Sequence, residues 1–424
     1  MRFKKFVVLL VLATLFIGTV GIQAQEIDFE GETVTFLCNW EFIDPEGEDA
    51  KEIMEDYNIG EINMLTVPWG EIYDTAMSRL LSGESEYDVW FLGHTFPHPL
   101  LKEDALYPIS EILGMEYYEK LPESKQVIAE AFTLDQDRRY VIPDTDAEFI
   151  DSVFVYWNKN IFESQGLQNP FELYQQGEWT YEAMEEIAKN ATIENEDGEI
   201  EQWGIARIHH KDWMLTNGGN YLEWEDGKLK LGFDERHREA ISVLKEWHND
   251  DEILKSADYA DDAAMHDTFV SGDAAMTASQ PWELWPGQME DDWSIVPMPK
   301  GPQAEDYSFM RMTTNSFFLP TNTAVPEKMV ALIEALYPMD EYEYNVENSI
   351  RDYAPDEETV EVLMDYNEGP VAHSYYESIF VVDEFWGTMY DIVNSEKSVS
   401  TGFEEVRPVI EANIEEYNQY ITGN

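Results

Sequence analysis

The order of expected strands and helices is the feature that most constrains the fold. Residues 33–37, 61–67 and 88–92 have the length and apolar content of strands. Helices are expected between them, over residues 48–57 and 69–82, so that strand and helix alternate. This alternation is typical of a parallel sheet with helices on both of its faces. The first part of the chain therefore predicts an α/β lobe.

The rest of the chain continues this alternation without an internal repeat. Further strands are expected at residues 140–143, 152–156, 203–206, 274–276, 294–297 and 315–319, and further helices at 158–162, 180–188, 238–247, 326–335 and 407–420. The helix that Pro68 opens carries five apolar residues that we assign to one buried face: Ile72, Ala76, Met77, Leu80 and Leu81. A polar loop is expected between Gly166 and Gly177. With 424 residues and 44% hydrophobic content, the chain has material for two cores.

Acidic residues dominate the charge of the chain. It contains 87 Asp and Glu against 26 Lys and Arg, a formal net charge of -61, and the part after residue 24 is three charges more negative, at -64. Repulsion on this scale destabilises a compact fold at low ionic strength, and salt screens it. We interpret the acidity as adaptation to strong brine, with a cation-binding protein as the alternative. The absence of a basic patch argues against nucleic acid or an anionic membrane as partner.

The first 24 residues have the pattern of a signal peptide. Arg2, Lys4 and Lys5 form a basic start, and an apolar core from Phe6 to Ile17 follows. Small residues for cleavage end this segment, at residues 21–24. The apolar core is short for a membrane span, although an uncleaved anchor is the alternative. The sequence therefore predicts an exported protein, in the periplasm or at the cell exterior.

The chain contains one cysteine, Cys38, within the strand-like run TVTFLCNW. A single cysteine cannot form an intrachain disulfide. It stands too far after the apolar signal core to be a lipid-anchor cysteine. We expect a buried thiol without a functional role.

The run FVSGDAAMTASQPW at residues 269–282 predicts a helix end, a strand and an exposed ring. Gly272 supplies a helix stop, and residues 274–276 can lie in a buried strand. Pro281 then breaks the strand and turns Trp282 outward. An indole at the carboxyl end of a strand is a suitable platform for a flat, partly apolar ligand. Core packing is the alternative for a tryptophan beside a proline.

Several short motifs together carry a resemblance to a known family. They are residues 156–159 (YWNK) with Phe162, Gly218 and Gly219 after a helix, the run at 269–282, residues 296–302 (VPMPKGP), and Phe385 with Trp386. In this order and spacing, they resemble the extracytoplasmic solute-binding proteins of ABC importers, in the large family that includes the maltose-binding protein. The resemblance covers nearly the whole chain after the signal peptide.

The resemblance implies a periplasmic binding protein-like II fold, with two α/β lobes joined by a hinge and a ligand cleft between them. Lobe 1 would comprise residues 25–147 plus 310–338, and lobe 2 residues 148–309 plus 339–424. The chain would cross between the lobes near residues 144–152, 309–312 and 337–343. Ligand would close the lobes, and the closed form would dock on a membrane permease.

The resemblance also implies a set of ligand-binding residues in the cleft. They are Trp282, Trp386, His94, Gly93, Trp40, Glu41, Trp69, Trp213, His210 and Asn315. A sugar ring can pack its C–H face on an indole while its hydroxyl groups form hydrogen bonds in the ring plane. Ordinary packing is the alternative for each residue, and for Trp69 it is slightly preferred. Leu92 and Thr95 stand where the family often has an acidic residue or tryptophan, which leaves the sugar open.

Metal and enzyme chemistry find little support in the sequence. Pro97 and Pro99 prevent His94 and His98 from forming a helical metal-binding pair, and the side chains of His209 and His210 point apart on a strand. The chain contains no G-x-S-x-G, H-E-x-x-H, Walker or G-x-G-x-x-G motif. We therefore expect no catalytic residue, no metal and no cofactor.

The sequence predicts an exported, monomeric binding protein for a sugar or oligosaccharide, which delivers its ligand to the permease subunits of an ABC importer. A binding protein for another solute, such as a peptide or polyol, is one alternative. A secreted carbohydrate-active enzyme is a second alternative, because no spacing of the many carboxylates selects or excludes a glycosidase pair.

Overall fold

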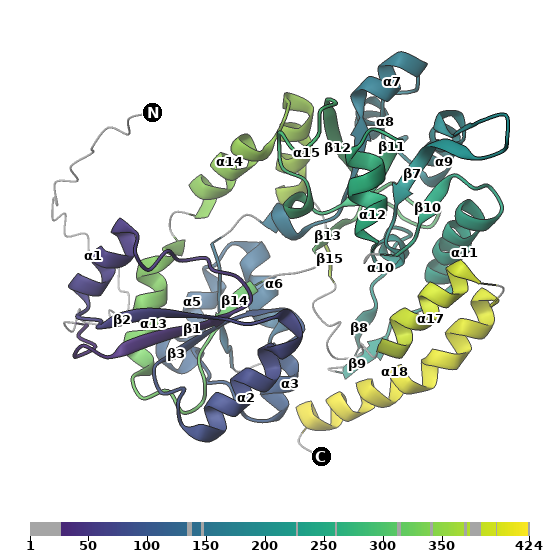
Figure 1. The fold of residues 1–424 in the computed structure, drawn as a ribbon. Coiled ribbons are helices and arrows are strands. Elements are labelled where there is room, and N and C mark those ends of the chain that lie inside the picture. Colours follow the sequence, from purple (N-terminus) through teal and green to yellow (C-terminus); the bar gives the residue numbers. More distant parts are fainter. Residues whose placement is uncertain are drawn as a thin grey trace.

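The computed structural model describes residues 27–133, 138–145, 148–225, 228–258, 261–311, 315–339, 342–368, 371–373, 383–395 and 397–422. The expected signal peptide, residues 1–24, lies outside these ranges. Two separate sheets organise the described chain, one in each of two lobes (Figure 1). None of the described helices is both long enough and apolar enough to cross a membrane.

The first lobe is built on a five-stranded sheet with strand order β2-β1-β3-β14-β4. Strands β1 (Thr33–Cys38), β2 (Glu61–Thr66) and β3 (Asp88–Gly93) are parallel, as the alternating sequence pattern predicts. Strand β14 (Asn315–Phe318) pairs antiparallel with β3 and with β4 (Val141–Pro143). A strand from late in the sequence therefore completes the sheet of the first lobe.

The helices of the first lobe cover both faces of this sheet. They are α1 (Glu48–Asp56), α2 (Ile72–Ser82), α3 (Pro97–Lys102), α4 (Ser110–Leu113), α5 (Met115–Glu119), α6 (Glu123–Ala131) and α13 (Pro326–Leu336), and a 3-10 turn, Trp69–Glu71, precedes α2. One core joins Phe36, Phe91 and Phe317 of the sheet to Met329 of α13. Cys38 belongs to this core and is fully buried, as expected, and burial raises the pKa of its thiol.

The buried face expected for α2 is wrong at one position. Ile72 and Ala76 are buried, but Leu81 is 82% exposed. Nine residues separate Leu81 from Ile72, which is two and a half helical turns, so the two side chains lie on opposite faces. Gly83 ends the helix with a positive φ of 77°, and its N–H group reaches the carbonyl groups of the last turn.

The second lobe is built on a six-stranded sheet with order β10-β7-β11-β5-β12, and β6 (Ile193–Glu194) pairs beside β7. Strands β10 (Leu254–Ser256), β7 (Ile200–Arg207) and β11 (Ala274–Ser279) are parallel. Strands β5 (Phe154–Asn158) and β12 (Trp293–Pro297) pair antiparallel with their neighbours, β11 with β5 and β5 with β12. The second sheet thus repeats the mixed architecture of the first.

The second lobe also carries most of the helices in the described part of the chain. They are α7 (Lys159–Gln165), α8 (Pro170–Gln176), α9 (Tyr181–Ala191), α10 (His210–Leu215), α11 (Glu235–Asn249), α12 (Asp262–Ala264), α14 (Tyr342–Tyr353), α15 (Glu357–Glu368), α17 (Asp383–Asn394) and α18 (Val399–Thr422). A two-stranded hairpin, β8 (Leu222–Glu225) and β9 (Lys228–Leu231), lies beside α18. Figure 1 shows α17 and α18 in yellow along the outside of this lobe.

The polar loop expected between Gly166 and Gly177 is wrong, because the segment contains helix α8. The Asn169 side chain accepts hydrogen bonds from the N–H groups of Phe171 and Glu172, and Pro170 occupies the first helical position. Gly177 then ends the helix in a left-handed conformation. The start and stop residues were present in the sequence, but the helix is too short for a visible apolar period.

Among the described residues, the chain passes between the two main sheets twice, and a third passage joins helices of the two lobes. It leaves β4 and reaches β5 through a 3-10 turn, Glu148–Asp151, and it returns between β12 and β14. On this return, β13 (Phe309–Arg311) pairs parallel with β15 (Val371–His373). The third passage leads from α13 to α14. The residue bounds of the lobes given above stay a prediction.

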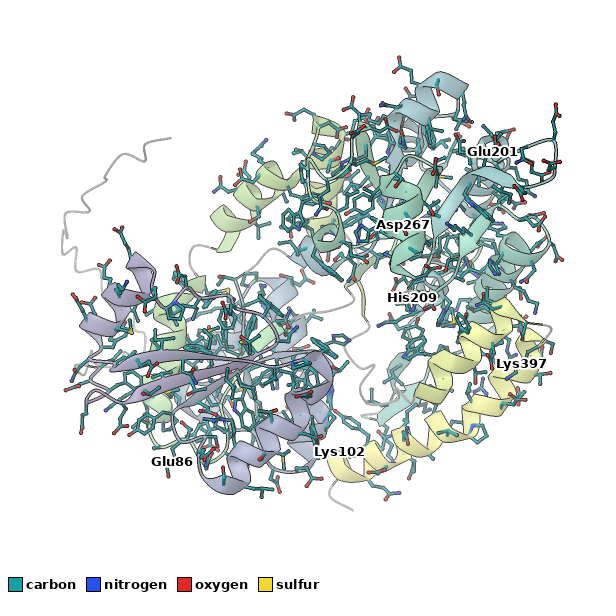
Figure 2. The ribbon with its side chains drawn as sticks, viewed as in Figure 1. Glu86, Lys102, Glu201, His209, Asp267 and Lys397 are labelled. Carbon is teal, nitrogen blue, oxygen red and sulfur yellow. The ribbon has the colours of Figure 1, made fainter. Side chains whose placement is uncertain are left out.

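The lobes also contact each other through the end of α18. The Lys102 ammonium of α3 lies 2.7 Å from the Glu416 carboxylate. Figure 2 shows Lys102 near the end of α18. The Tyr417 hydroxyl donates to the Thr133 carbonyl oxygen at 3.1 Å, and Asn418 binds the backbone of Leu229 in β9. The end of α18 therefore bridges the second lobe and the first.

Candidate functional site

Trp282 lies on a turn at the carboxyl end of β11. The strand is buried along its whole length, and a π-helical turn, Met265–Val270, with Gly272 at a φ of 86° precedes it. A 3-10 turn, Pro281–Glu283, follows and leaves the Trp282 side chain 44% exposed. The strand, the break and the outward indole are as the sequence predicts.

Buried polar groups hold this turn from below. The Glu283 carboxylate accepts hydrogen bonds from the Arg207 guanidinium at 2.6 Å, from the Ser279 hydroxyl at 2.5 Å and from the Gln280 N–H at 3.3 Å. Arg207 is the last residue of β7, and both charged side chains are almost fully buried. The ring of Trp282 is thus carried by a short turn that is fixed to two neighbouring strands.

The turn also adjoins the first passage between the lobes. The Tyr353 hydroxyl of α14 donates to the Leu284 carbonyl oxygen at 3.0 Å. The Tyr353 ring contacts Phe149, in the 3-10 turn of the crossing segment, at a centroid distance of 5.5 Å. The candidate platform is therefore packed against the segment that links the two sheets.

Three aromatic side chains follow the carboxyl ends of the parallel strands in the first lobe. Trp40 comes after β1, Trp69 after β2 and His94 after β3. Carboxyl ends of parallel strands meet at one edge of a sheet, which is where open α/β sheets bind ligands. Trp40 is 37% exposed and Trp69 is 39% exposed, and Glu41 beside Trp40 is exposed as well.

Trp69, Gly93, His94 and Asn315 form one contiguous group at this edge. The Trp69 ring lies so close to Gly93 that a Cβ atom there would come within 2.1 Å of it, so only glycine allows this ring position. The ring centroids of Trp69 and His94 are 6.4 Å apart. Asn315 pairs with Gly93 across β14 and β3, and its buried Oδ1 atom has no hydrogen-bond partner among the described residues.

Trp386 and His210 come together in the second lobe. The Trp386 ring of α17 is half-buried, and its centroid lies 5.8 Å from the centroid of the His210 ring. The Lys211 ammonium lies 5.6 Å from the Trp386 ring centroid. His210 is buried and its Nδ1 atom is 3.2 Å from the Ala257 carbonyl oxygen. Burial lowers the pKa of His210 to about 3, so its ring is neutral at pH 7. Its neighbour His209 is partly exposed (Figure 2).

The assignment of Trp213 to the ligand site is wrong. Its side chain is fully buried and stacks on Tyr181 with a centroid distance of 4.1 Å. Its Nε1–H group donates to the Ala240 carbonyl oxygen at 2.9 Å. The indole is therefore enclosed by α9, α10 and α11 and has no free face or donor for a ligand.

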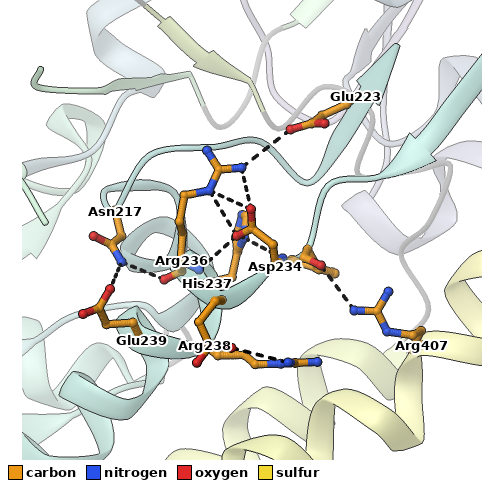
Figure 3. Close-up of polar contacts among 10 residues, drawn as sticks. Asn217, Glu223, Asp234, Arg236, His237, Arg238, Glu239 and Arg407 are labelled. Carbon is orange, nitrogen blue, oxygen red and sulfur yellow. Dashed lines mark hydrogen bonds and ion pairs between the residues drawn. The ribbon is translucent and has the colours of Figure 1, made fainter. Parts of the chain in front are cut away.

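The turn at Gly218 and Gly219 has a structural role. Both glycines have positive φ angles, and a Cβ atom at Gly219 would meet the Arg236 guanidinium at 2.9 Å. Asn217 Nδ2 donates to the Arg236 carbonyl oxygen and to the Glu239 carboxylate, and Arg236 pairs with Asp234 (Figure 3). This network joins the turn to the start of α11.

Residues 43–338 match the family model described as bacterial extracellular solute-binding protein. The chain belongs to this family. Its members and the solved structures that resemble it are binding proteins. No curated protein matches the sequence of this solute-binding protein.

Solved structures of sugar-binding proteins share the fold of this solute-binding protein. An ABC substrate-binding protein from Listeria monocytogenes in complex with cycloalternan is 13% identical, with a TM-score of 0.68 over 91% of this chain and 99% of that chain. The maltose/maltodextrin-binding domain of Bdellovibrio bacteriovorus bound to maltotriose is 14% identical, with a TM-score of 0.62 over 90% and 100%. The GacH receptor of Streptomyces glaucescens, solved unliganded and with acarbose, is 15% identical, with a TM-score of 0.64 over 93% of this chain and 99% of that chain. At these identities the similarity establishes the two-lobed fold.

The ion pair beneath Trp282 is not among the features that the sequence predicts. A usable signal was present, because Glu283 stands three residues after Gln280 and Pro281 lies between them, the spacing of a helix capping box. Nothing in the sequence pairs Arg207 with Glu283, since 76 residues separate them and only the parallel pairing of β7 and β11 brings them together. Among the described residues of this solute-binding protein, no group of three His, Cys, Asp or Glu could hold a metal ion.

Proposed function

We propose that this protein captures a sugar or oligosaccharide between its two lobes. The observation that carries the proposal is the exposed Trp282 ring at the carboxyl edge of the second sheet, with exposed Trp40 and Trp69 at the corresponding edge of the first sheet. Indole faces on both lobes suit the two faces of pyranose rings. Similar solved proteins were obtained with cycloalternan, maltotriose and acarbose, which supports a carbohydrate ligand.

The ligand would bridge the lobes and shift an equilibrium between open and closed forms. Lobe 1 would comprise residues 25–147 plus 310–338 and lobe 2 residues 148–309 plus 339–424. The ligand contacts proposed in the first lobe are Trp40, Glu41, Trp69, Gly93, His94 and Asn315, and those in the second lobe are His210, Trp282 and Trp386. The side chains supply stacking surfaces and hydrogen bonds, and no bond of the ligand is broken.

The closed form would deliver the ligand to the permease subunits of an ABC importer. Export by the segment at residues 1–24 would place the protein in the periplasm or at the cell exterior, as a monomer. The family to which the chain belongs consists of extracellular solute-binding proteins, which supports this location.

A titration of tryptophan fluorescence in molar NaCl tests the sugar assignment. The panel comprises maltose, maltotriose, a cyclic glucan, a polyol and a short peptide, and released reducing ends are assayed in parallel. We expect a saturable change with at least one sugar and no release of reducing ends. Saturation with the peptide or polyol alone would contradict the sugar assignment, and release of reducing ends would identify a carbohydrate-active enzyme instead.

We further propose that the acidic surface adapts the protein to high salt. Most of the 87 acidic residues have no basic partner, because only 26 Lys and Arg are present. Salt screens their mutual repulsion. The free energy of unfolding should therefore rise steeply between about 0.05 M and about 2 M NaCl. Urea unfolding at the two concentrations measures this rise, with KCl as a second salt. An unfolding free energy independent of salt would contradict the adaptation.

A further inference from the structure

We propose that Arg207 and Glu283 are positioning residues for Trp282, and that their buried ion pair holds the indole in the orientation that binds sugar. The inference rests on the proposed sugar-binding function. It assigns a role in ligand affinity to two side chains that lie beneath the ligand surface and contact no ligand themselves.

The geometry of the ion pair fixes the Glu283 carboxylate. The Arg207 guanidinium donates to Glu283 Oε2 at 2.6 Å, and its side chain is 2% exposed against 6% for the Glu283 side chain. A buried charge is retained only where its partner and hydrogen bonds compensate for lost hydration. Here the same carboxylate oxygen also accepts from the Ser279 hydroxyl at 2.5 Å and from the Gln280 N–H at 3.3 Å. The carboxylate is therefore fixed in one place.

Glu283 is also the last residue of the turn that carries Trp282. Pro281, Trp282 and Glu283 form the whole 3-10 turn, and Glu283 and Gln280 close it as a reciprocal capping box. The turn has two backbone hydrogen bonds of its own, from the Glu283 N–H to the Gln280 carbonyl oxygen at 2.9 Å and from the Leu284 N–H to the Pro281 carbonyl oxygen at 3.3 Å, and hydrogen bonds in 3-10 turns have poorer geometry than those in α-helices. The orientation of Trp282, whose ring is 44% exposed, is therefore determined by what holds the residue next to it.

Arg207 links the turn to a rigid part of the sheet. Arg207 ends β7, which pairs with β11 on one side and with β10 on the other. Its carbonyl oxygen accepts from the Thr277 hydroxyl of β11 at 3.4 Å. The ion pair therefore transfers the rigidity of three parallel strands to the turn after β11, which is the way a binding residue on a loop is kept in a productive position.

Hydrogen exchange tests the positioning independently of any ligand. In Glu283→Gln, the peptide that covers residues 280–284 should exchange at least tenfold faster, while peptides from α9 and α11 exchange as in the wild type. Asp88→Asn is the matched control, because the buried Asp88 carboxylate pairs with the partly buried Arg79 guanidinium, at 2.7 Å, in the first lobe. The control should leave residues 280–284 unchanged. Equal protection of these residues in Glu283→Gln and wild type would overturn the positioning role.

Titrations with maltotriose then test the link to Trp282. Arg207→Met should weaken binding at least tenfold in the wild-type background and less than twofold in Trp282→Ala, because the pair acts only through the indole. An equal loss in both backgrounds would show that Arg207 acts elsewhere. Failure of the wild type to bind maltotriose, with residues 280–284 exchanging as predicted, would contradict the sugar assignment and would support the role of the ion pair in fixing the turn.

A double variant separates positioning from stability. Arg207→Met with Glu283→Leu removes both charges and leaves an apolar pair, which commonly restores stability. We expect a melting temperature close to that of the wild type together with affinity for maltotriose at least tenfold weaker. If the double variant recovered both the stability and the sugar affinity of the wild type, the ion pair would contribute only to stability, and the positioning role would be contradicted.

Discussion

Replacement of Trp282 by alanine is expected to weaken sugar binding by about 2 kcal/mol or more, roughly 30-fold, without loss of the fold. The ring is 44% exposed, so its removal costs little packing. A buried aromatic platform in a closed cleft, by contrast, belongs to the side chains with the largest effects on affinity. Calorimetric titration of wild type and variant with the best sugar of the panel measures the difference.

Trp285→Ala is the matched control for this experiment. Trp285 stands three residues after Trp282 and is 42% exposed, but its ring edge already rests on Tyr353, at a centroid distance of 5.5 Å. We expect the sugar affinity of Trp285→Ala to stay within about twofold of that of the wild type, because the Trp285 ring is not a candidate platform. Equal losses in the two variants, or none in Trp282→Ala, would refute the assignment of the platform.

The second large effect concerns His98 and the stability of the contact between the lobes in acid. The His98 ring is buried between Phe132 and Tyr417, and Nε2–H donates to the Ala131 carbonyl oxygen at 2.8 Å. Burial lowers the pKa of His98 to about 4, from an ordinary value of 6.5. Below pH 6.5, His98 binds a proton in the unfolded chain but stays neutral in the folded protein. The free energy of unfolding therefore falls as the pH decreases toward 4.

The expected size of this loss is roughly 3 kcal/mol between pH 7 and pH 4, since each unit of pKa difference corresponds to about 1.4 kcal/mol. Urea unfolding of wild type and His98→Gln across this range isolates the effect, because both proteins share all other titrating groups. The variant keeps a donor for Ala131 and should lose less stability in acid. His266→Gln, at an exposed position, should follow the wild type. Parallel curves for His98→Gln and wild type would contradict the prediction.

The regular elements of the fold could be predicted well from the sequence. The three parallel strands of the first lobe and the strand before Trp282 follow from short apolar runs bounded by Gly, Pro and helix caps. Helix α8 was missed because seven residues are too few for an apolar period, so that only its capping residues announce it. Leu81 does not belong to the buried face because apolar character alone does not decide burial. The angle of the side chain around the helix decides whether it faces the core.

The candidate site could be predicted only where residues follow strand ends. Trp40, Trp69 and His94 each follow a parallel strand of the first sheet, whose topology gathers them at one edge, and Trp282 follows β11 of the second sheet. Trp213 was wrong because a helical tryptophan can face either way, and here Tyr181 and Ala240 enclose it. The pairing of Arg207 with Glu283 depends on strand order, which no local pattern in the sequence encodes.

The most direct test of the account is small-angle X-ray scattering of the wild type in molar NaCl, with and without a saturating concentration of the sugar selected by titration. Closure of two lobes around a ligand brings their centres of mass together. We predict a smaller radius of gyration with sugar than without it, and for Trp282→Ala the same decrease only at a roughly 30-fold higher sugar concentration. An unchanged radius of gyration in the sugar-saturated wild type would contradict capture of the ligand between the lobes.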